Sequence, residues 1–238
     1  MLERNPIGWL QQYAWSARLI KWGLCLGLIV AECLLLTTGI YGLVRSQDQL
    51  AFVVPLGLVL SAAGSFRRER ESGALELILV SPLRVSQIIA GRLRGIWGQF
   101  LPALLVLLLV WYGVDDTWWN RRWLGIPSSG WDRYRFPIQL LATYLALPIV
   151  GLYFSLRSRH YLTGVALSLG FGLWLPWLPA ALLSFSSVSA GIPGWQWLPG
   201  LEGWYLVTVG KLLVGLLALL ALWRALARRS FQALQRAG

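Results

Sequence analysis

The sequence predicts an all-α polytopic membrane protein with six transmembrane helices. Of the 238 residues, 57% are hydrophobic and 13% are charged, whereas a soluble domain carries about 25% charged residues. Several apolar runs reach the roughly 20 residues that a helix needs to cross a bilayer. Basic residues gather in the short segments between those runs, which is typical of loops that set membrane topology.

The first 21 residues predict an amphipathic helix that lies on the membrane surface. Asn5 and Pro6 can start a helix, because Asn caps well and Pro suits the first helical position. Apolar residues then recur at helical spacing. Trp9 and Trp15 are typical of the membrane–water interface. A disordered tail is the alternative, and the periodicity disfavours it.

Six apolar segments follow, and each is predicted to be a membrane-spanning helix. Their expected bounds are 22–43, 50–66, 93–114, 136–156, 161–183 and 204–223. Residues 184–203 are rich in Gly and Pro, so we expect an outer re-entrant element before the sixth span. With a tail at 224–238, the whole of 1–238 is expected to form one transmembrane domain.

The distribution of charge predicts the orientation. Fifteen of the 21 Lys and Arg residues fall on the side of the two termini, five fall on the other side, and Lys211 lies within a span. The positive-inside rule therefore places both termini in the cytoplasm of a multi-pass protein of the inner membrane. The net charge of +11 is explained by contact with anionic lipid headgroups, so we expect the bilayer, and no nucleic acid, as its partner.

An enzymatic role finds little support in the sequence. The chain has one histidine, His160, and no GxxxxGK[ST] phosphate loop, so neither a multi-His metal site nor ATP binding by that loop is expected. Three acids of the outer loop, Asp115, Asp116 and Asp132, lie among arginines. We expect them to form salt bridges, and we expect no catalytic residue, no metal and no cofactor in this chain.

Two ionisable residues fall inside predicted spans. Glu32 lies near the middle of the first span, and Lys211 lies about seven residues from the outer end of the sixth. Because a charge inside a bilayer is costly, it is usually paired or faces a polar cavity. A structural Glu32–Lys211 pair and a role in a substrate pathway both remain open. Gly23 and Gly27 form a GxxxG pattern that permits close helix approach.

The segment at 67–92, between the second and third spans, carries more pattern than a loop needs. Ser81 and Pro82 fit a helix N-cap and first position. We therefore expect a second, short amphipathic helix after an extension of the second span. Its two faces differ: one carries Val85, Ile88, Ile89 and Arg92, and the other carries Arg84, Gln87 and Gly91.

This segment resembles the cytoplasmic hallmark of type-2 ABC transporter permeases, whose pattern is roughly E-x-E/x-G-T-L-E-x-L-L-x-T/S-P-x-x-x-x-x-I-x-x-G-K. The matching residues are Glu69, Glu71, Gly73, Ala74, Leu75, Glu76, Ile78, Leu79, Ser81, Pro82, Ile88, Gly91 and Arg92. Ala74 replaces the usual Thr, Arg92 replaces Lys, and the outer loop at 115–135 is longer than usual for the family.

The resemblance implies a permease subunit of an exporter. Two copies of a separate ATP-binding subunit, which hold ATP and Mg, would dock on a cytoplasmic coupling helix, and a second membrane subunit, identical or homologous, would complete the transporter. It also implies which residues contact the ATPase: Glu69, Glu71, Gly73, Leu75, Glu76, Leu79, Ser81, Pro82, Leu83, Arg84, Gln87, Gly91 and Arg92.

Other classes of function stay open at this point. A membrane-embedded lipid-modifying enzyme could use Glu32 or the outer acids, and a channel-like or assembly protein would need neither. These alternatives require no ATPase partner, whereas the permease requires one. The sequence does not identify a substrate.

Overall fold

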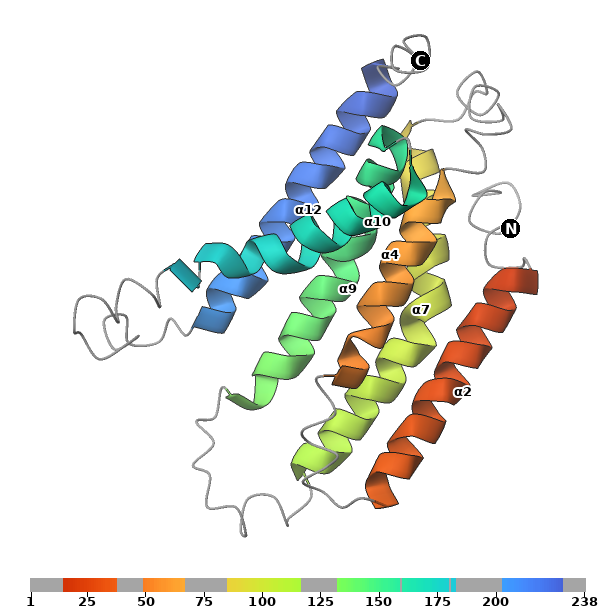
Figure 1. The fold of residues 1–238 in the computed structure, drawn as a ribbon, viewed down its shortest axis with the longest axis vertical. Helices are drawn as coiled ribbons and strands as arrows, with labels where there is room; N and C mark the ends of the chain where they lie inside the picture. The colour runs from red at the N-terminus through yellow and green to blue at the C-terminus, as the bar shows by residue number, and fades with distance from the viewer. Residues whose placement is uncertain are drawn as a thin grey trace, which may run out of the picture. The chain divides into compact units, whose positions relative to one another are not determined.

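The computed structural model describes residues 15–37, 49–66, 85–116, 132–158, 160–179, 181–182 and 203–228. The helices are shown in Figure 1: α2 (Trp15–Thr37), α4 (Val53–Ser65), α7 (Val85–Asp116), α9 (Asp132–Arg157), α10 (Tyr161–Leu169) and α12 (Gly203–Arg228). α10 continues into a π-helix, η1 (Gly170–Trp174), and a 3-10 helix, η2 (Leu175–Trp177). Each of the six predicted segments overlaps one of these helices, which confirms the all-α fold.

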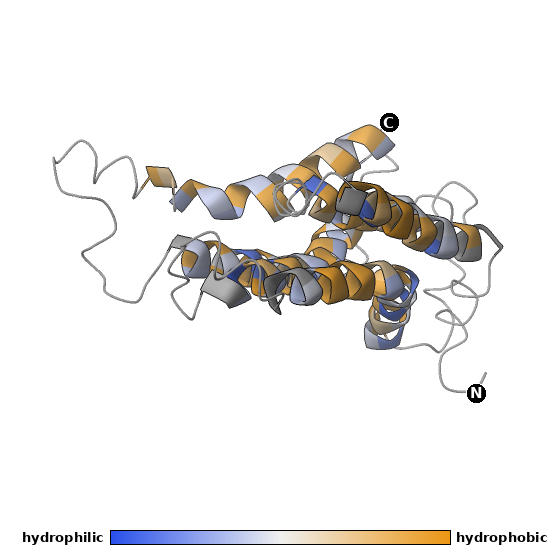
Figure 2. Cartoon of the chain, turned by 90° about the horizontal axis from the view of Figure 1, so that it is seen from below, coloured by the Kyte–Doolittle hydropathy of each residue, from blue (hydrophilic) through white to orange (hydrophobic). Residues whose placement is uncertain are grey.

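Three helices are long and apolar enough to span a membrane: Val85–Gly113, Tyr134–Arg157 and Trp204–Ala227. Two shorter apolar helices cover Gln49–Ser65 and Tyr161–Trp177. Figure 2 shows apolar residues along most of the length of the described helices. That these helices and the remaining ones cross a membrane, giving six spans, stays a prediction.

Two helices continue across boundaries that the sequence predicts. α2 runs without a break through Lys21, and α7 runs without a break through Arg92. The described part of the expected coupling helix is therefore the first turns of α7 and not a separate element. No proline interrupts either junction, and the one proline inside α7 is Pro102, so nothing there removes a helical hydrogen bond.

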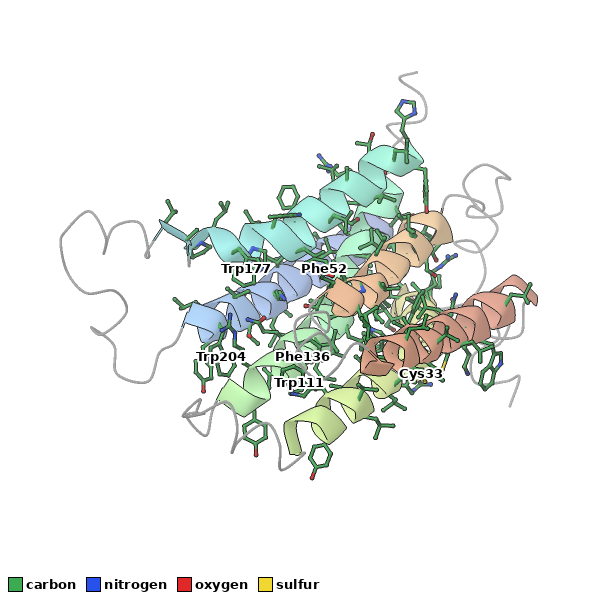
Figure 3. All side chains as sticks on the ribbon, turned by 60° about the horizontal axis from the view of Figure 1, so that its bottom comes forward. Cys33, Phe52, Trp111, Phe136, Trp177 and Trp204 are labelled. Carbon is green, nitrogen blue, oxygen red and sulfur yellow. The ribbon has the colours of Figure 1, made fainter. Side chains whose placement is uncertain are left out.

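The chain forms two compact units. The first consists of Met1–Gly57 and Gly91–Leu140. Within it, α4 approaches α7 at a glycine: a Cβ on Gly57 would lie 2.6 Å from the ring of Phe100. Trp111 of α7 stacks on Phe136 of α9, with ring centroids 4.4 Å apart (Figure 3). The end of α7 thus meets the beginning of α9.

The second unit consists of Leu58–Ala90 and Leu141–Gly238. Its apolar core is formed by residues of α4, α9 and α10: Val59, Ala63, Leu147 and Val165, with Tyr161, Leu169 and Leu173 packed against them. Two glycines of this unit permit very close helix contact. A Cβ on Gly151 would lie 2.6 Å from the Cβ of Ala62, and one on Gly215 would lie 2.8 Å from the Cβ of Ala146.

Contacts inside the second unit give the direction of its helices. Thr143 and then Ala146 of α9 meet Lys211 and then Gly215 of α12, in the same order along both chains. α9 and α12 therefore run parallel. Gly151 and Ser155 of α9 likewise follow Ala62 and Phe66 of α4, whereas Gly172, late in the fifth helical segment, packs on Leu147 of α9. Gly164 and then Gly172 of the fifth helical segment meet Phe154 and then Leu147 of α9, so this segment runs antiparallel to α9.

The fifth helical segment changes its hydrogen-bond pattern near Pro176. Leu175 N–H donates to Gly170 O, five residues back, and Leu178 N–H donates to Leu175 O, three residues back. Since proline has no N–H and its ring clashes with the preceding turn, a π turn followed by a 3-10 turn lets the helix continue. A Cβ on Gly210 of α12 would lie 3.3 Å from the Cβ of Pro176, so α12 meets the segment at this point.

Several predicted elements lie outside the described residues. These are most of the interfacial helix, the Trp-rich outer loop from residue 117 to 131, and the re-entrant element except for Gly203. The two glycines of the GxxxG pattern are described, and a Cβ on Gly23 or Gly27 would meet nothing within 4 Å.

Candidate functional site

The end of α4, where the chain enters the predicted coupling segment, is tied to α9 by one serine. Ser155 Oγ donates a hydrogen bond to Ala63 O at 2.8 Å and accepts one from Phe66 N–H at 3.3 Å. The last carbonyls of a helix lack donors of their own, so a buried hydroxyl in this position satisfies them. Ser155 and Phe66 are both buried.

A second hydroxyl holds the same end of α4. Tyr161 OH, at the start of α10, donates to Leu60 O at 3.1 Å. Two side chains from the α9–α10 region thus bond to the last turns of α4. The position of residue 66, from which the predicted coupling segment departs, is therefore fixed by α9 and α10 as well as by α4 itself.

The start of α7, where the chain returns from that segment, presents two different sides. Ile88 and Ile89 are buried with exposed fractions of 2% and 5%, and Arg92 is buried completely, as the predicted face requires. The exposed residues repeat at helical spacing on another side: Ser86, Gln87, Ala90 and Arg94. We call these four residues the α7 stripe.

The structure divides the predicted contact residues of this helix. Gln87 belongs to the exposed α7 stripe, whereas Gly91 and Arg92 are buried. Arg92 and Gly91 are thus placed to pack α7 against the rest of the chain. The other predicted contact residues, from Glu69 to Arg84, lie outside the described residues, and their role stays a prediction.

A polar contact inside the apolar helices joins α12 to α9. Lys211 Nζ donates a hydrogen bond to Thr143 Oγ1 at 2.8 Å. Both side chains are buried, with exposed fractions of 5% and 4%. On the same face of α12, Thr208 Oγ1 donates a hydrogen bond to Trp204 O of its own helix at 2.8 Å. Trp204 is labelled in Figure 3.

Glu32, the other ionisable residue of the predicted polar pair, is buried in α2 with an exposed fraction of 3%. It belongs to the first compact unit and Lys211 belongs to the second. The Glu32–Lys211 pair therefore stays a prediction. What the structure adds is a different and specific partner for Lys211, the hydroxyl of Thr143.

Within the described part of the chain, no group of three or more His, Cys, Asp or Glu side chains lies close enough to hold a metal ion. His160 is exposed immediately before α10, and its carbonyl accepts a hydrogen bond from Gly164 N–H at 3.1 Å. His160 therefore occupies the N-cap position of α10.

Three residues of this arrangement were not identified in the sequence: Ser155, Tyr161 and Thr143. For Thr143 a signal existed, because a lysine inside a bilayer needs an oxygen partner and Thr143 lies at a similar depth in a neighbouring span. For Ser155 there was none, since Ser158 stands three residues away at the same helix end, and its hydroxyl donates to Phe154 O of its own helix.

Comparison of the chain with protein families, with curated proteins and with solved structures found no match.

Proposed function

We propose that this chain is the membrane-spanning permease subunit of an ATP-binding-cassette exporter. A separate ATPase subunit would dock on the segment at 67–92 and drive the membrane domain. The observation that carries the proposal is the pattern of acids, glycines and the Ser81–Pro82 step in that segment. The all-helical fold, with three helices apolar enough to span a membrane, is consistent with it.

The geometry at the two ends of the segment supports a mechanical role. One end leaves α4 where Ser155 and Tyr161 hold it, and the other enters α7, a single helix of 32 residues. A displacement of the segment would thus act on α4, α9 and α7 together. The exposed α7 stripe, with Gln87 and Arg94, is the described surface that an ATPase could contact. ATP-driven movement requires that the two states of the ATPase contact this surface differently.

Co-purification tests the proposal. The tagged chain, purified from its native host in a mild detergent, should carry a second protein that contains a phosphate-binding loop and hydrolyses ATP. Combined replacement of Pro82 and Arg84 by alanine should lower the amount of that ATPase about tenfold, because central interface residues each contribute more than about 1 kcal/mol. Quantitative mass spectrometry of the eluate measures the ratio.

Arg224→Ala provides the matched control. Arg224 is an exposed arginine near the end of α12, outside the proposed docking segment, and its loss removes the same charge. We expect it to leave the ATPase ratio unchanged. Purification of a fully active chain with no ATPase would contradict the proposal and favour the membrane-embedded enzyme or scaffold.

A further inference from the structure

The buried lysine of α12 is held deep within the apolar helices. Lys211 and Thr143 lie in two of the helices that are long and apolar enough to span a membrane. Thr143 is nine residues from Tyr134, which places it about 13 Å from that end of its helix. A lysine near a membrane surface normally extends its ammonium toward water. Lys211 instead directs its ammonium to Thr143 of the neighbouring helix.

Among the described residues, the hydrogen-bond partner of this ammonium is a neutral group. An ammonium has three N–H donors, and among the described residues its hydrogen-bond acceptor is the single neutral hydroxyl of Thr143. The nearby Thr208 hydroxyl donates to Trp204 O in its own helix. A buried charge is costly unless an opposite charge and further hydrogen bonds accompany it. The geometry therefore favours an acidic group as a further partner of this ammonium.

We propose that Lys211 and Thr143 form a binding site for the acidic headgroup, a phosphate or a carboxylate, of an amphiphilic substrate. The ammonium supplies the charge and up to two further hydrogen bonds, which are strong toward an anionic oxygen. Thr143 holds the lysine in place, because its hydroxyl accepts the 2.8 Å hydrogen bond from the ammonium. That the bound amphiphile is a substrate rests on the proposed function, whereas binding of its headgroup does not.

Equilibrium binding to the purified chain tests the site. Radiolabelled dodecyl phosphate and laurate are titrated onto the full chain in dodecyl maltoside micelles without any ATPase, and inorganic phosphate is titrated separately. We expect saturable binding of one amphiphilic acid per chain. Lys211→Met should weaken it about tenfold or more, Lys211→Arg should retain most of it, and Thr143→Val should weaken it severalfold. If inorganic phosphate binds with the same affinity, the inference that the ligand is amphiphilic is overturned.

Lys21→Met is the matched control, because Lys21 lies at the start of α2 with its ammonium 5.7 Å from the Trp22 ring centroid. Its binding curve should equal that of the wild type. If Lys211→Met fails to fold, the ratio of the binding affinities of Lys211→Arg and Thr143→Val decides. Lys211→Arg retains a buried polar group, and Thr143→Val retains an isosteric one. Wild-type affinity in Lys211→Met overturns the site.

Binding that appears only after Glu32→Gln also overturns the proposal, because Glu32 would then be the counter-ion of Lys211. None of these measurements requires an ATPase. Failure of the proposed function would show in the co-purification, and failure of the headgroup site would show in the titration.

Discussion

At the scale of single residues, the absence of a methyl group determines how closely helices approach. Gly215 and Gly151 each face the Cβ of an alanine on the adjacent helix, Ala146 and Ala62. In a bilayer, lipid tails solvate apolar side chains as well as protein does, so helix association depends on close packing and on interhelical hydrogen bonds. These two glycines provide that packing in the second unit.

Gly215→Ala should destabilise the protein by about 1–3 kcal/mol, because the new methyl group would overlap Ala146 and force α9 and α12 apart. Gly113→Ala is the control. Gly113 lies in α7 with nothing within 4 Å of its would-be Cβ, so alanine there should be neutral or should gain up to about 1 kcal/mol of helix propensity. Thermal unfolding in detergent measures both variants, and equal melting temperatures would refute the overlap.

The sequence alone did not distinguish these glycines. The GxxxG pattern drew attention to Gly23 and Gly27, around which the described chain leaves open space. Gly151 and Gly215 carry no such pattern. What makes them important is the alanine across the interface, and helix pairing is a property of tertiary structure that the spacing within one helix does not contain.

At the scale of elements, one side chain joins the end of one helix to another helix. Ser155 bonds both a carbonyl and an N–H of α4, and these bonds cross 92 and 89 residues of chain. Such a contact fixes the direction in which the chain leaves α4. Any force on the following segment would reach α9 through this serine.

Ser155→Ala should cost about 1–3 kcal/mol of stability, because it leaves buried backbone groups without a partner. If the proposed function holds, it should also lower transport more than ATP hydrolysis. Ser168→Ala is the matched control: Ser168 is equally buried, but its hydroxyl donates at 2.6 Å to Gly164 O in its own helix. The melting temperature and the ratio of transport to hydrolysis are measured, and identical behaviour of the two variants would count against the role of Ser155.

The order of the helices could be predicted because each long apolar run has few structures available to it in a bilayer. Helix ends were harder. α2 already includes Trp15 although the predicted first span starts at residue 22, and α7 already includes Val85 although its apolar run starts at Leu93. A helix continues until backbone or capping chemistry stops it, and hydropathy alone does not record that chemistry.

At the scale of the whole molecule, α4, α9 and α12 run in the same direction within the second unit. That they are the second, fourth and sixth spans, oriented as the basic residues predict, stays a prediction. Three helices are long and apolar enough to cross a membrane. Whether α2 also crosses the membrane can be measured directly, because both cysteines of the chain lie in it.

Cys33 is exposed on α2 and Cys25 is buried, so Cys33 reports the environment of this helix. We expect no labelling of Cys33 by a membrane-impermeant maleimide in intact membranes, because the charged reagent does not enter the hydrocarbon core, and complete labelling after denaturation. Arg224→Cys, near the end of α12, should be labelled from the cytoplasmic side alone. Labelling of that variant from the outer side would reverse the predicted orientation.

The π turn at Gly170–Trp174 has a consequence for what the fifth helical segment can touch. On a regular helix, at 100° per residue, Pro176 would lie on the same side as Val165 and Leu169. The wider turn rotates the following residues by about one position, and Pro176 meets Gly210 of α12 while Val165 and Leu169 stay on the core formed by α4 and α9. The segment thus behaves as though one residue had been inserted into it, and that insertion lets a single helix serve two sets of neighbours. Deleting one residue here should restore a regular helix and lose the contact with α12.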